Sequence, residues 1–92
     1  MNAYRMPVTV RRELKIAPEV VAAVYARAAA ILENDFTYGV HHAITKASDH
    51  LPEHVYRFAF TSFYERFGVW SGDDDGVTML CFAAAIARTG DL

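Results

Sequence analysis

Apolar residues recur along this chain at helical spacing, in segments separated by short polar or glycine-containing breaks. The first such segment covers residues 18–34, with Glu19, Arg27 and Glu33 on the face opposite the apolar one. Pro18 suits the first position of a helix, because its missing N–H would have no intrahelical partner there. The pattern predicts an amphipathic helix over residues 18–34.

A second, weaker helix is predicted over residues 38–50. Its apolar positions form one narrow stripe at three- and four-residue steps: Val40, Ile44, Ala47 and Leu51. Gly39 and Thr45 lower its intrinsic stability, so we expect tertiary contacts to supply most of its order.

The third predicted helix, residues 52–67, belongs to the most aromatic part of the chain. Residues 55–70 contain seven of the twelve aromatic residues, and we expect the domain to be organised around this helix. On a helical wheel, one arc holds Ala59, Trp70, Phe63, Tyr56, Phe67, Phe60 and Tyr64. The other holds Arg57, Thr61, Ser62, Glu65 and Arg66.

Phe58 falls among these polar residues, so we expect it to be exposed unless the N-terminal arm covers it, and we predict that it contacts a partner.

A last helix is predicted over residues 76–89, and it is apolar nearly all round until Arg88. A helix of this kind is typically central or lies at a subunit interface.

The acidic turn before this helix contains Asp73, Asp74 and Asp75. We expect Asp74 or Asp75 to cap the helix and Asp73 to face solvent, and the same residues are candidates for docking against a basic partner.

These elements predict a single all-α domain over residues 1–92, a compact arrangement of four helices with an extended N-terminal arm at residues 1–17. The alternative is an α+β domain. In that alternative, residues 69–80 form a small hairpin across the acidic turn, and Val8 and Val10 lie in a strand beside it.

The composition indicates more apolar surface than a small domain hides easily. Apolar residues make up 53% of the chain and charged residues 22%, which favours a homodimer. The sole cysteine, Cys81, lies in an apolar run, so we expect a buried thiol and a cytoplasmic location. No apolar segment is long enough to predict a membrane span.

Nucleic-acid binding is an alternative function, and it depends on the arm. The arm's basic residues are Arg5, Arg11, Arg12 and Lys15. The net charge of −2 disfavours a polyanionic partner, and no predicted helix has a basic face that would read bases.

A third and less favoured function is metal-dependent hydrolysis at His50, Glu53 and His54. Their spacing matches the H-x-x-E-H pattern of inverted zinc peptidases. Pro52 is expected to start a new helix and so to separate His50 from the other two residues. We therefore predict a polar junction between two helices, with no metal and no cofactor.

The chain also lacks the Gly-x-Ser-x-Gly and glycine-rich phosphate motifs, so we do not expect an enzyme. The leading hypothesis is a protein–protein interaction module that binds and occludes a macromolecular partner. Such chains are typical of inhibitors that phages or mobile elements direct against host systems. The predicted contacts are Phe58, Arg57, Glu65 and Asp73–Asp75.

Overall fold

The computed structural model describes residues 16–35, 39–68 and 75–90. This part of the chain forms four helices and no strand. The helices are α2 (Pro18–Asn34), α3 (Val40–Ala47), α4 (Glu53–Phe67) and α5 (Gly76–Arg88). The predicted all-α class is confirmed. The hairpin alternative is wrong for residues 77–80, which lie in α5, while residues 69–74 and the arm up to residue 15 fall outside the described residues.

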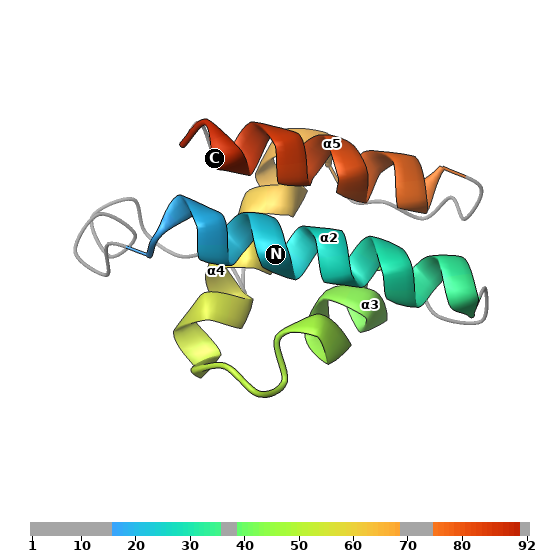
Figure 1. The fold of residues 1–92 in the computed structure, drawn as a ribbon, viewed down its shortest axis with the longest axis horizontal. Coiled ribbons are helices and arrows are strands. Elements are labelled where there is room, and N and C mark those ends of the chain that lie inside the picture. The colour runs from blue at the N-terminus through green and yellow to red at the C-terminus, as the bar shows by residue number, and fades with distance from the viewer. Residues whose placement is uncertain (1–15, 36–38, 69–74, 91–92) are drawn as a thin grey trace.

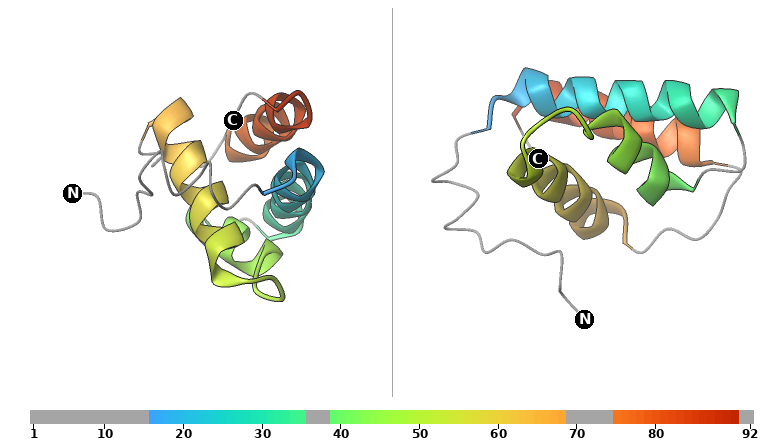
Figure 2. Two further views of the ribbon diagram at one scale, coloured as in Figure 1. Left: turned by 90° about the vertical axis from the view of Figure 1, so that its left-hand side faces the viewer. Right: turned by 90° about the horizontal axis from the view of Figure 1, so that it is seen from below.

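Two long helices, α2 and α5, lie side by side and run in opposite directions (Figure 1). Figure 2 shows α4 crossing this pair at a steep angle on one side, with α3 between α4 and α2. Buried alanines on both long helices, including Ala22, Ala29, Ala83 and Ala87, remove the bulk that would otherwise hold the two backbones apart.

The helix ends follow local chemistry. Pro18 begins α2 as predicted. The second helix is shorter than the predicted 38–50, because the hydroxyl of Ser48 donates a hydrogen bond to the Ile44 carbonyl (2.7 Å) and the chain turns before Pro52. Gly68 ends α4 at a φ of 77°, a conformation that favours glycine.

The helix with the most extensive contacts is α2, which packs chiefly against α5 and α3. The prediction that the aromatic helix organises the domain is not met in this respect, although α4 supplies the large core side chains Phe58, Phe60 and Phe63. Tyr25 of α2 is fully buried, and its ring packs against Phe63 of α4 at a centroid distance of 6.1 Å. Aromatic side chains fill the space between α4 and the other helices, so its backbone stands farther from them than α5 stands from α2.

The buried arc of α4 is wider than the predicted one: Ala59, Phe60 and Phe63 are buried as predicted, and residues of the opposite arc are buried as well. Phe58 is 9% exposed and belongs to the hydrophobic core, so the prediction that it is exposed is wrong. Thr61 and Ser62, predicted to face solvent, are buried as well, whereas Tyr64 is 37% exposed. Because the six consecutive residues 58–63 are all buried, the helix is covered on more than half its circumference.

Phe58 lies beside a small cavity between the start of α2 and the end of α5. The other residues that line this cavity are Ile16, Pro18, Val21, Ala87 and Gly90. Ile16 belongs to the last part of the predicted arm and packs against the core. We expected Phe58 to be covered only if the N-terminal arm lies over it. Ile16, at the end of the arm, lines the cavity beside Phe58 together with residues at the start of α2 and the end of α5.

Candidate protein-interaction surface

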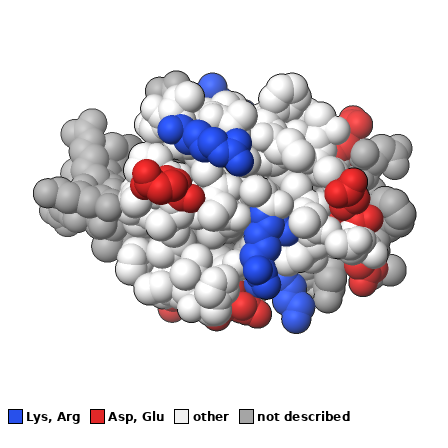
Figure 3. All heavy atoms as spheres, viewed as in Figure 1, with Lys and Arg blue, Asp and Glu red and all other residues white. Residues whose placement is uncertain are grey.

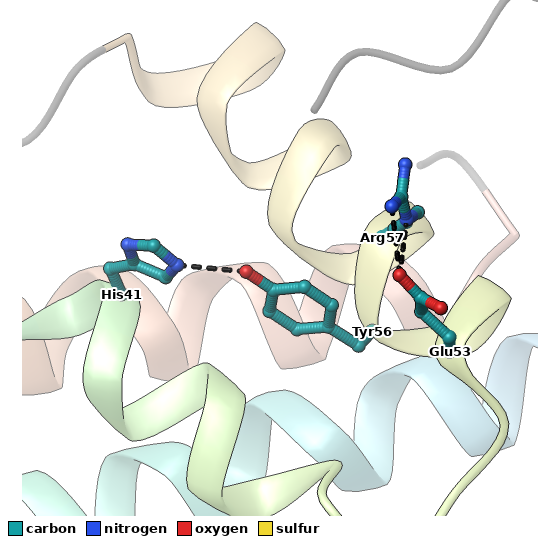
Figure 4. Close-up of polar contacts among 4 residues, drawn as sticks. All are labelled: His41, Glu53, Tyr56 and Arg57. Carbon is teal, nitrogen blue, oxygen red and sulfur yellow. Dashed lines mark hydrogen bonds and ion pairs between the residues drawn. The ribbon is translucent and has the colours of Figure 1, made fainter. Parts of the chain in front are cut away.

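The predicted contact residues of α4 other than Phe58 are exposed. Arg57 pairs with Glu53 one turn earlier, at 2.8 Å between Nη2 and Oε2 (Figure 4). Glu65 is exposed near the other end of the helix. Because the Arg57 charge is already matched within its own helix, it contributes little net field to a partner.

The acidic turn is described only at its last residue. Asp75 occupies the N-cap of α5 as predicted and is exposed, but its side chain makes no capping hydrogen bond. Asp73 and Asp74 lie outside the described residues, as do Arg5, Arg11, Arg12 and Lys15 of the predicted nucleic-acid-binding arm.

The main exposed apolar side chain among the described residues is Phe82 of α5, at 56% exposure. The opposite face of α5 is buried in the core through Leu80, Ala83, Ala84 and Ala87. The sequence pattern correctly indicated that α5 has more apolar surface than one core contact covers. It did not single out Phe82, because on a wheel that is apolar all round no position stands out as the outer one.

Cys81 lies next to Phe82 and is also exposed. The prediction of a buried thiol is wrong, because the apolar run around Cys81 is a helix with one face in solvent. The exposed residues of α5 together form one strip at three- and four-residue spacing: Asp75, Thr78, Cys81, Phe82, Ala85, Arg88 and Thr89. We call the uncharged part of this strip, residues 78–85, the α5 face.

The molecular surface over α5 is uncharged between its ends (Figure 3). Basic atoms lie over the C-terminal end of the helix, and acidic atoms lie near the N-terminal end. Large exposed phenyl rings are costly in water unless a partner covers them, so a face with this pattern has the properties of a protein contact.

A second cluster of rings joins α3 to α4. His41 stacks on Phe60 at a centroid distance of 4.2 Å, and its Nε2 forms a 2.8 Å hydrogen bond with the hydroxyl of Tyr56 (Figure 4). Tyr64 lies against the same Phe60 ring at 4.4 Å. Partial burial, and secondly the neighbouring His42, lower the pKa of His41 below its ordinary value. This cluster fixes α3 on α4.

The polar junction predicted from Asp49, His50, Glu53 and His54 is found only in part, as a contact between Asp49 and His50 at the corner between α3 and α4. His50 lies 3.6 Å from the Asp49 carboxylate, and both side chains are well exposed. Within the described residues, no group of three or more His, Cys, Asp and Glu side chains is placed to hold a metal ion. Glu53 instead pairs with Arg57, away from a shared site with His50 and His54.

A shallow groove runs between α2 and the corner that follows α3. Its floor is apolar, with Val20, Val24 and Leu51, and its edges carry Glu19 and Arg27. A second, more polar hollow shares Arg27 with this groove and is lined by Ile31, Asn34, Asp35, Lys46 and Asp49. The groove is open to solvent, and its polar side chains do not point to one shared position. A typical catalytic pocket is more enclosed and brings a few polar groups together.

Comparisons with known proteins found no match: no family model, no curated protein and no solved structure resembles this chain significantly. None of the helices in the described part of the chain has the length and apolar character needed to cross a bilayer.

Proposed function

We propose that this protein is a non-catalytic protein-interaction module that binds a protein partner through the α5 face. The observation that supports the proposal most is the exposure of Phe82, more than half of whose surface is in contact with solvent. A phenyl ring gains roughly 2 kcal/mol when it is fully covered, so it is a suitable anchor at the centre of an interface.

The surroundings of Phe82 fit such a role. Its neighbours Thr78, Cys81 and Ala85 are small and uncharged, so a partner can approach the helix closely without desolvating a charge. This surface replaces Phe58 as the proposed anchor, since Phe58 is in the core. A homodimer is one form of the proposed interaction.

The test uses Cys81, the only cysteine of the chain, as a reporter of what touches the α5 face. A photoreactive maleimide attached at Cys81 is activated in purified protein and in an extract of the source cell, and adducts are identified by mass spectrometry. We expect adducts to a protein, either another copy or a different chain, that are lost in Phe82→Ser.

Val20→Ser is the matched control, because Val20 is also an exposed apolar side chain but lies on α2. This variant should keep the adducts. The proposal is overturned if folded wild-type protein gives no protein adduct, or if the adducts persist in Phe82→Ser.

A further inference from the structure

The exposed strip of α5 has a symmetry that points to its partner. Counted outward from the midpoint between Cys81 and Phe82, Thr78 and Ala85 are equally distant, and so are Asp75 and Arg88. Two copies of a helix that pair in opposite directions about a two-fold axis at this midpoint bring each residue to the level of its counterpart. The sequence of the strip therefore decides whether such a pair is complementary.

We propose that the α5 face pairs with the α5 face of a second copy, antiparallel, with the two-fold axis passing between Cys81 and Phe82. This inference rests on the proposed function and names its partner. The pairing sets the large ring of Phe82 at the level of Cys81 of the partner subunit. Thr78 and Ala85, which flank the centre, are small enough for the two helices to approach closely around the rings.

The charges at the two ends of the strip select the antiparallel arrangement. Asp75 is exposed at the start of α5 and Arg88 at its end, and neither forms an ion pair with another described residue. Antiparallel pairing brings the basic end of each helix to the acidic end of the other, and the sequence places two more aspartates directly before Asp75. A parallel pair would set like charges together at both ends and align the helix dipoles unfavourably.

The size of the contact predicts a weak dimer. A helix of 13 residues is about 20 Å long, and one helix-on-helix contact buries less than the roughly 1,600 Å² of a standard stable interface. We therefore expect the monomer and dimer to exchange at roughly micromolar to submillimolar chain concentrations. The proposal requires measurements across that range.

The first test is sedimentation velocity of the full chain over this concentration range. We expect wild-type mass to rise from 10.3 kDa towards twice that value, and Phe82→Ser to weaken association by about tenfold or more. Val20→Ser is the control and should associate like wild type. Circular dichroism of each variant checks that it is folded.

Cross-linking reports the geometry independently. Both Cys81 thiols lie close to the proposed axis, so a short bismaleimide should join two wild-type chains through Cys81 and should not join Phe82→Ser chains at the same concentration.

The charge pattern gives a third measurement. Arg88→Glu should weaken association several-fold, and adding Asp75→Lys to Arg88→Glu should restore it, because the reversed charges are again complementary.

The outcomes separate this inference from the proposed function. Any of three results would overturn the antiparallel self-pairing. The wild-type chain could stay monomeric, Phe82→Ser could leave dimerisation unchanged, or Asp75→Lys could fail to restore the association that Arg88→Glu weakens. If the wild type is monomeric but the photoreactive probe at Cys81 still captures a different protein in a Phe82-dependent manner, self-pairing fails and the proposed function stands.

Discussion

The hydroxyl of Tyr25 on α2 donates a hydrogen bond to the main-chain carbonyl of Ala59 on α4, at 2.5 Å. Both residues are fully buried, so this bond crosses the core and ties together the two helices whose backbones stand apart. A buried carbonyl that loses such a donor is left without water to replace it.

Tyr25→Phe removes this hydroxyl and keeps the ring. We expect it to lower the free energy of unfolding by about 1–2 kcal/mol, which is measurable by urea denaturation at neutral pH. An unchanged midpoint would mean that the hydrogen bond contributes nothing to stability.

The same residue predicts a response to alkaline pH. Burial raises the pKa of Tyr25 above its ordinary value of about 10, so the folded state holds the phenolic proton more tightly than the unfolded state does. The stability that Tyr25 contributes through its protonated hydroxyl is complete below pH 10 and is lost as the pH rises above 10. The stability difference between wild type and Tyr25→Phe should therefore narrow above pH 10 in denaturation curves recorded at several pH values.

The same substitution should destabilise the protein strongly at Phe58 and hardly at all at Phe82. Phe58→Ala removes a buried ring and should cost about 3–5 kcal/mol, enough to leave the chain largely unfolded if its stability is in the range usual for small domains. Phe82→Ala should change the stability of the monomer by no more than about 0.5 kcal/mol. Thermal melts of dilute protein compare the two, and a similar loss in both would contradict the assignment of Phe82 to the surface.

His41 predicts a loss of stability in mild acid. Its pKa is lowered by partial burial and by His42, so the unfolded state takes up a proton at a higher pH than the folded state. The stability present at neutral pH should decline as the pH falls below about 6.5. The decline should be smaller in His41→Gln, compared by urea denaturation between pH 7.5 and 5.5.

Gly68 predicts a backbone effect. Its φ of 77° and ψ of −178° lie in a region that only glycine occupies readily, so Gly68→Ala should destabilise the protein by about 1–3 kcal/mol although an added Cβ would meet no atom within 4 Å. Gly39→Ala is the matched control, because Gly39 has an ordinary φ of −89° and equally open surroundings. The measurement is the denaturation midpoint of each variant, and equal values for the two would contradict the prediction.

The sequence alone determined which segments are helical and where most of the helices end. Local signals suffice for these, because Pro18 starts α2, Gly68 stops α4 and the spacing of apolar residues marks each helix. The predicted 18–34 and the observed Pro18–Asn34 coincide, and the final helix differs from its prediction by one residue. Only α3 was clearly overextended, since its end depends on how the chain turns into Pro52.

Only the tertiary structure decided which apolar side chains face inward. A helical wheel gives the angle between residues but not the number of neighbours that cover the helix. Phe58, among polar residues, was therefore assigned to the wrong environment, and Phe82, in an apolar run, was not distinguished from its neighbours. A wide arc of α4 is buried, including Thr61 and Ser62, while α5 has one buried face and one exposed strip. The excess of apolar residues was visible in the composition, but its location at Phe82 depends on distances between helices that no local pattern encodes.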